Sequence, residues 1–361
     1  MLFPDSTNHR KRSEHSTSNG PFREVAVVTL LMVCVSVTSV SGYQDIEWPT
    51  SMGEPVQGAA RTPNSKSERE RWLTNMVAHH GFSLAEVKAA TGLESDDIVA
   101  EVRRLGIHPF SAGEVAEGLR VLPYPGGRHP RTGFLDGAVR PQRETKFSIF
   151  LPWDHRSYVV ADIPEAIWSN LGLTYLAHTH IDTVWDAQKI KLQPMEWQRT
   201  AAEHLWLERR LPNGLAFGTE SATHDGLVMM RMWLRNGTSL RLSDLRVQNC
   251  IMLKAAPGFD DETNENKRFR GAYVACHDTT GTRWIITAWQ PIHRAWANPP
   301  CPCLHADPRF PDVDPGETEQ LVGMLSFYEG DDIERELQRL QSKGWETYWK
   351  DQPLPRSTES D

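Results

Sequence analysis

The hydrophobic positions of the chain repeat every second residue over its C-terminal two thirds. In KFSIFLPW, Phe147, Ile149 and Leu151 share one face of an expected strand. The segments LVMMRMWLRNGT, LRVQNCIML, RWIITAW and LVGMLSFY are also strand-like, and turn residues separate them. A period of two places alternate side chains on opposite faces of a sheet, and many short strands between Gly, Pro and Asn turns indicate an all-β domain. We therefore predict a mainly β fold, an antiparallel β-sandwich of supersandwich type over residues 120–330.

A helical period precedes these strands in residues 66–110. Ser83 and Glu86 form an expected capping box, and Ile98 and Val102 recur at helical spacing. The run FSLAEVKAATGLESDDIVAEVRRLGI resembles a helix-turn-helix. The net charge of −8 and the acidic start of the second helix argue against nucleic acid as a partner, because phosphates attract basic surfaces. We interpret the segment as a small N-terminal helical packing unit.

The two ends of the chain differ in composition from the middle. Residues 1–42 combine basic positions, an apolar run and small residues, which is typical of a secretory signal peptide; an uncleaved membrane anchor at residues 25–44 is the alternative. Either interpretation places the remainder in the periplasm or outside the cell. Residues 43–65 are expected to be a linker. Residues 331–349 predict a C-terminal helix, and residues 350–361 predict a disordered tail.

The first polar cluster lies in GGRHPRTGFLDG and the RPQRETK that follows it. It contains Arg128, His129, Arg131 and Arg143 next to flexible glycines. Guanidinium groups bind carboxylates through paired hydrogen bonds, so this composition predicts a loop that binds an anionic sugar or carboxylate. The alternative is a solvated loop whose charges pair with one another.

The second polar cluster is AHTHIDTVWD. In a strand, His178 and His180 would point to the same face. One interpretation is acid–base catalysis in which a carboxylate orients an imidazole, and the candidate carboxylates are Glu165, Asp182, Asp186 and Glu329. Another is a metal site to which His305 adds a ligand, although two histidines alone do not complete one; the third is structural hydrogen bonding. Trp185 and Asp186 follow as candidate ligand-binding residues.

Four cysteines follow the predicted export segment: Cys250, Cys276, Cys301 and Cys303. All four are disulfide candidates in an oxidising compartment. A Cys301–Cys303 bond would close a strained ring, so either residue would pair with Cys250 or Cys276. Thiols beside His305 also suit a soft metal, but the spacing C-x-C is less specific than C-x2-C, and we rank disulfides or buried thiols ahead of metal.

Several strings resemble an uncharacterised exported bacterial family: GRHPRTGFLDG, PQRETK, AHTHIDTVWD and CPCLHADP. More distantly, LRNGTSLRLSDL and DPGETEQL are similar to stretches of galactose mutarotase-like supersandwich proteins. This second resemblance implies a sugar ligand. It also implies that two histidines and a glutamate act on the sugar, and His178, His180 and Glu329 are the candidates for these roles.

These patterns together predict carbohydrate binding or modification outside the cytoplasm, with a glycan or small sugar as partner. Trp153, Trp168 and Trp185 are candidate platforms for a sugar ring, because indoles present wide apolar faces. The hypothesis requires these side chains to converge on one concavity with the polar clusters. The alternatives are a metal-dependent enzyme that uses the H-x-H pair and a non-catalytic envelope or assembly module.

Overall fold

A computed structural model describes residues 46–52, 60–110, 118–126, 139–141, 144–179, 181–201 and 203–355. These residues fall within one structural unit, Asp45–Asp361. The predicted signal peptide or anchor lies outside the described residues. So do five of the predicted site residues, namely Arg128, His129, Arg131, Arg143 and His180.

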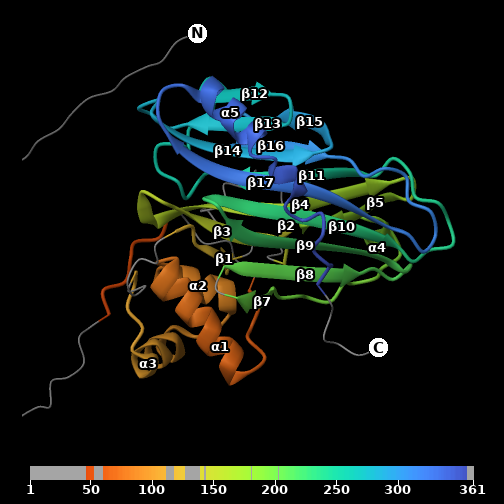
Figure 1. Ribbon diagram of the computed structural model, residues 1–361. Helices are drawn as coiled ribbons and strands as arrows, with labels where there is room; N and C mark the ends of the chain where they lie inside the picture. Colours follow the sequence, from red (N-terminus) through yellow and green to blue (C-terminus); the bar gives the residue numbers. More distant parts are fainter. Residues whose placement is uncertain are drawn as a thin grey trace, which may run out of the picture. The chain divides into compact units, whose positions relative to one another are not determined.

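Within the described residues, the strands form two large antiparallel sheets and one small one (Figure 1). The seven-stranded sheet has the order β1-β3-β4-β11-β16-β15, with β5 also pairing with β4. Its strands are β1 (Val121–Pro123), β3 (Lys146–Leu151), β4 (Asp154–Ser169), β5 (Gly172–Leu176), β11 (Arg246–Met252), β15 (Ile292–Trp296) and β16 (Cys303–Pro308).

The eight-stranded sheet has the order β12-β13-β14-β17-β10-β9-β8-β7 in the same part of the chain. Its strands are β7 (Gln198–Ala201), β8 (His204–Arg210), β9 (Leu215–His224), β10 (Leu227–Asn236), β12 (Lys267–Arg270), β13 (Tyr273–His277), β14 (Arg283–Gln290) and β17 (Thr318–Glu329). The small sheet pairs β2 (Val139–Pro141) with β6 (His178–Thr179).

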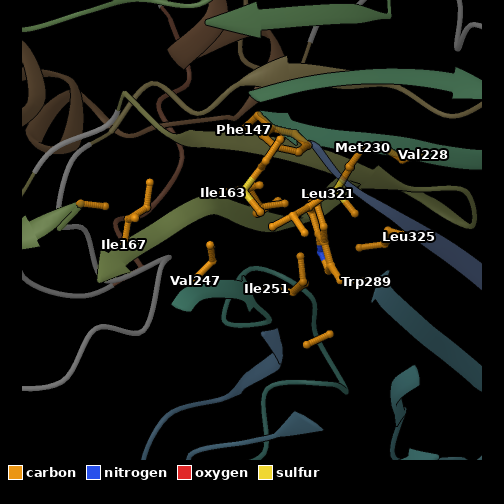
Figure 2. Packing of buried hydrophobic residues seen from close by; sticks show 14 of the residues in the cluster. Phe147, Ile163, Ile167, Val228, Met230, Val247, Ile251, Trp289, Leu321 and Leu325 are labelled. Carbon is orange, nitrogen blue, oxygen red and sulfur yellow. The ribbon is translucent and has the colours of Figure 1, made fainter. Parts of the chain in front are cut away.

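The main hydrophobic core lies between the two large sheets. Phe147 and Ile251 of the seven-stranded sheet meet Met230, Trp289 and Leu325 of the eight-stranded sheet there (Figure 2). These residues sit at the alternating positions that predicted the strands, because every second side chain of each strand faces the partner sheet. The prediction of a mainly β, antiparallel sandwich is confirmed.

The predicted helical unit contains α1 (Lys66–Leu73), the π-helix η1 (Thr74–His79), α2 (Leu84–Thr91) and α3 (Ser95–Leu105). The capping box of Ser83 and Glu86 begins α2 as the sequence indicated. The apolar side chains of this unit form a second hydrophobic cluster with Phe150 and Tyr158, which face away from the main core. The helical unit therefore covers the outer face of the seven-stranded sheet.

The C-terminal part packs on the outer face of the eight-stranded sheet. Helix α5 (Ile333–Ser342) begins at its N-cap Asp332 and is followed by the 3₁₀ helix η3 (Trp345–Thr347). Gly344 separates them with a φ of 64°, so the predicted single helix over 331–349 is two short ones. The buried Arg231 donates hydrogen bonds to the carbonyl groups of Gln352 and Pro353, which holds the first residues of the predicted disordered tail.

A short helix, α4 (Val184–Ala187), follows β6. None of the helices in the described ranges is long and apolar enough to cross a membrane.

Candidate functional site

Polar side chains gather on the outer face of the seven-stranded sheet, beside the helical unit. On β16, Leu304 and Ala306 belong to the main core, so Cys303, His305 and Asp307 face the opposite side of the sheet. All three are nevertheless buried. Buried polar groups need partners, and the partners of these residues define the candidate site.

Glu165, near the end of β4, is the centre of the first group, which we call the acid–imidazole cluster: Glu165, His178, Gln248 and His305. The Nε2 atom of His178 lies 3.1 Å from Glu165 Oε1. Gln248 Nε2 donates a hydrogen bond of 2.7 Å to Glu165 Oε2. The Nδ1 atom of His305 is 3.8 Å from the same oxygen. One carboxylate is thus held by side chains from three further strands.

Strand pairing explains why these residues meet although they are far apart in sequence. Strand β5 folds back on β4, with Leu176 opposite Ala166, and the Ala177 N–H donates a 2.7 Å hydrogen bond to the carbonyl of Glu165. His178 therefore begins β6 next to Glu165. Strand β11 lies beside β4 on the other side, and β16 lies beside β11. This order brings Gln248 and His305 to the same carboxylate.

His305 links the acid–imidazole cluster to a group of sulfur atoms. Its Nε2 atom lies 3.2 Å from Cys303 Sγ, and its Nδ1 atom is 2.7 Å from the carbonyl oxygen of Asn249. A carbonyl oxygen only accepts hydrogen bonds, so Nδ1 carries the proton and Nε2 faces the sulfur. The indole ring of Trp296 stacks on the imidazole with centroids 4.0 Å apart. The orientation of His305 is fixed from three directions.

Asp307 closes this end of the site. Its Oδ1 atom accepts a 3.1 Å hydrogen bond from the Asn249 N–H. Its Oδ2 atom accepts hydrogen bonds from Trp296 Nε1 at 2.6 Å and Arg294 Nη2 at 2.9 Å. Asp307 therefore holds both the ring that stacks on His305 and the backbone of Asn249, the residue whose carbonyl orients His305.

Burial shifts the proton affinities of the acid–imidazole cluster. It raises the pKa of Glu165 to about 7, although the positive charge of His305 acts in the opposite direction. Burial also acts to lower the pKa of His305, but the hydrogen bond to Cys303 and the nearby negative charges outweigh it and raise the pKa to about 9. A carboxyl group with a pKa near neutrality can both accept and give a proton at ordinary pH.

The thiol cluster consists of Cys250, Cys301 and Cys303. Hydrogen bonds from the thiols of Cys250 and Cys301, with that from His305, hold the pKa of Cys303 far below its usual value. The opposite shift occurs in its neighbours: burial raises the pKa of Cys250, and the hydrogen bond to Cys303 raises the pKa of Cys301. Cys303 is therefore the most acidic of the three thiols.

The structure brings some of the predicted site residues together. His178 and His305 both contact Glu165, one of the carboxylates available for acid–base chemistry. The end of the arginine-rich segment is also close to His178, because Pro141 of β2 pairs with His178 of β6. The two predicted polar clusters therefore meet at the small sheet, although Arg128, Arg131, Arg143 and His180 lie outside the described residues.

Other predicted residues lie elsewhere. Glu329 is exposed at the end of β17 in the eight-stranded sheet, where it accepts a 2.8 Å hydrogen bond from Arg283. Among the described residues, the carboxylate beside His178 is Glu165. Asp186 closes a capping box with Thr183 at the start of α4.

The three tryptophans do not converge. Trp153 precedes the first residue of β4 and Trp168 lies near the last of its 16 residues, and the two rings pack against different hydrophobic clusters. Trp185 is buried in the main core and donates a 2.7 Å hydrogen bond to the carbonyl of Thr174. The structure does not support a common stacking platform made by these rings.

The four cysteines that were disulfide candidates are all free and buried. Cys276 lies on β13 in the eight-stranded sheet, away from the other three. The interpretation of C-x-C as buried thiols therefore describes the structure, and no disulfide links the described cysteines.

The sequence did not identify Gln248 or Asn249 as site residues, and it did not predict that Cys250 and Cys303 lie close together. A charged residue inside an apolar strand was the available signal for Glu165, because Ala161, Ile163 and Ile167 surround it in sequence. The partners of Glu165 come from other strands, and a single sequence does not contain their register.

No protein-family model matches the chain, and no curated protein matches it. Among solved structures, the chain is similar to a heparan sulfate lyase HepC mutant from Pedobacter heparinus, with 9% sequence identity and a TM-score of 0.29. The match covers 53% of this chain and spans 31% of the lyase chain, so the chain corresponds to about a third of that protein's length.

Proposed function

We propose that the protein is an acid–base enzyme that acts on a carbohydrate, with His178 as the group that transfers a proton. The observation that carries the proposal is the 3.1 Å contact between His178 Nε2 and Glu165 Oε1. A carboxylate that holds an imidazole fixes its orientation and stabilises its protonated form, which are the requirements for general acid–base catalysis.

Glu165 is a positioning residue in this proposal. Gln248 donates a hydrogen bond to its second oxygen and His305 lies 3.8 Å from the same oxygen, so the carboxylate presents a fixed edge to His178. A proton donor or acceptor is most effective when its direction is set before the substrate arrives. Gln248 is half-buried whereas the rest of the acid–imidazole cluster is buried, so the cluster approaches the surface on this side.

The substrate class comes from the resemblance to galactose mutarotase-like proteins and from the β-sandwich fold. Fold likeness indicates which ligands to test and does not define a site. The arginine-rich segment that leads to β2 adds a reason to include acidic sugars, because guanidinium groups bind carboxylates. Galactose, glucose and polygalacturonate are therefore the first probes.

The test measures turnover of these three probes by the full chain. Polarimetry follows the interconversion of galactose and glucose anomers, and ultraviolet absorbance follows double bonds formed in polygalacturonate. His178→Gln is expected to lower kcat by about 100- to 10,000-fold on the probe that is turned over. Glu165→Gln is expected to lower kcat while KM changes little, since Glu165 orients His178 and does not touch the substrate.

His155→Gln is the matched control, because His155 is exposed at the start of β4 and is not part of the cluster. Its kcat should equal that of the unmodified chain. The proposal is overturned if none of the three probes is bound or turned over, or if His178→Gln retains the kcat of the control while its circular dichroism is native.

A further inference from the structure

The thiol cluster has the composition of a metal site. Cys250 Sγ, Cys303 Sγ and a ring nitrogen of His305 all lie within 4.8 Å of one another. Cys301 is a third sulfur nearby, since it belongs to the same buried cluster as Cys250 and Cys303. Three sulfurs and one imidazole nitrogen make up a frequent four-ligand set for tetrahedral metal ions in proteins.

The backbone places these groups on one face of two adjacent strands. Cys303 and His305 are two residues apart on β16 and therefore point the same way. Strand β11 runs antiparallel to β16, with Ile251 opposite Leu304, and the same register continued by one residue places Cys250 opposite His305. Two paired strands hold their side chains in fixed positions, and a metal site with precise geometry needs such rigid support.

The separation of Cys303 and His305 is close to that of two ligands in a tetrahedral site. Metal–sulfur bonds of about 2.3 Å and metal–nitrogen bonds of about 2.0–2.1 Å place neighbouring ligand atoms roughly 3.5–3.8 Å apart. The observed separation of Cys303 Sγ and His305 Nε2 is 3.2 Å. Shifts of a few tenths of an ångström would therefore admit an ion between them.

The surroundings of the cluster also suit a metal. The Nδ1–H of His305 donates to the carbonyl of Asn249, leaving Nε2 to face the sulfurs, and this outer contact is typical of metal-bound histidines. The thioether of Met252 lies 3.0 Å from Cys250 Sγ and adds a further soft donor. All three cysteines belong to the hydrophobic cluster that the helical unit covers, so water is largely excluded.

We propose that Cys250, Cys303 and His305, with Cys301 as the fourth ligand, bind a soft metal ion with a filled d shell, Zn(II) or Cu(I). Thiolate, thioether and imidazole ligands select these ions over hard cations. The site adjoins the proposed proton-transfer group, because His305 also lies 3.8 Å from Glu165 Oε2, but His178 on the other oxygen of Glu165 is not one of its ligands. On binding, Nε2 of His305 and each ligating thiol release to solvent any proton that they still carry.

The first experiment measures metal in the untagged full chain by mass spectrometry. The chain is produced once in zinc-supplemented medium and once in copper-supplemented medium, and about one ion per chain is expected from one of the two. Metal-free protein, prepared with a chelator and a reductant, is then titrated with Zn(II) and separately with Cu(I) in competition with an indicator dye. The preferred ion distinguishes the two arms.

Cys303→Ser and Cys276→Ser are the matched variants, because both remove a buried cysteine from the sandwich. Cys303→Ser is expected to weaken binding by more than about 100-fold, since the loss of an outer-shell partner alone weakens metal binding by about 10- to 100-fold. Cys276→Ser should bind as the unmodified chain does, because Cys276 lies on β13 in the other sheet.

Cobalt(II) substitution gives a readout that needs no variant. The unmodified chain should show an intense near-ultraviolet band from thiolate-to-cobalt charge transfer, together with the visible bands of tetrahedral cobalt. Absence of both bands, together with failure to bind Zn(II) or Cu(I), overturns the proposal. A Cys250–Cys303 disulfide in the isolated chain that persists when it is produced with either metal overturns it as well.

Discussion

Replacing Arg231 by methionine should cost more stability than any exposed charge replacement in this fold. Arg231 lies on β10 with its side chain 1% exposed, and its Nε donates to Glu220, which is opposite it on β9. Its two terminal nitrogens donate to the carbonyl oxygens of Gln352 and Pro353, at 2.9 and 2.6 Å. Methionine fills a similar volume but replaces none of these hydrogen bonds.

The expected loss follows from what remains buried after the change. Glu220 is itself buried and would keep only the 2.6 Å contact with His204 Nε2. Removing one partner of a buried ion pair costs about 3–5 kcal/mol, because the remaining charge is poorly solvated. The two carbonyl groups also lose a charged donor, but they lie near the C-terminal end of the described chain and can turn to water. We therefore expect a loss of about 3–5 kcal/mol.

The assay is urea unfolding followed by tryptophan fluorescence, with Arg235→Met as control. Arg235 lies on the same strand, but its side chain is 40% exposed and its nitrogen is 3.7 Å from Glu208, so a change of about 0.5 kcal/mol or less is expected. The double variant with Glu220→Gln should lose less than the sum of the two single variants, because no unpaired charge remains. A loss for Arg231→Met equal to that of Arg235→Met would refute the reasoning.

Two further predictions concern the helical unit and the eight-stranded sheet. Burial and the charges of Arg120 and Arg199 lower the pKa of His79 to about 4, so the folded state favours the neutral ring. The stability that the neutral ring contributes is complete above about pH 6.5 and is lost as the pH falls toward 4. His79→Gln should therefore reduce the difference in unfolding free energy between neutral and acidic pH by about 1–2 kcal/mol, a value lowered because the ring is partly exposed. An equal pH dependence in both proteins would contradict this. Gly323→Ala should lower the free energy of unfolding by about 1–3 kcal/mol, because the Cβ of the alanine would overlap the indole of Trp289 on the neighbouring strand. An unchanged melting temperature would contradict this account of the packing.

Local chemistry explains which parts of the fold were predictable. The alternation of Phe147, Ile149 and Leu151 indicates the face of the strand that packs against the other sheet, and the capping box at Ser83 indicates the start of a helix. Both features are determined by residues that are close together in the sequence. The helix after Asp332 was identified for the same reason.

The candidate site was predictable only in part because it is assembled from four strands. His178 and His305 were both recognised as chemically capable, but their common partner Glu165 depends on the order in which β4, β11 and β16 lie in the sheet. Glu329 had the same chemistry and was preferred through a family resemblance, yet it ends a strand of the opposite sheet. Residue type indicates what a side chain can do, and strand order decides what it meets.

The shared burial of the thiol cluster and the helical unit has a practical consequence. Cys250, Cys301 and Cys303 lie in the same hydrophobic layer as the apolar side chains of α1 to α3. A thiol reagent in solution can reach these sulfurs only while that layer is transiently open. In metal-free protein, the rate of labelling therefore reports how often the helices lift from the sheet, and it measures the free energy of that local opening without unfolding the sandwich.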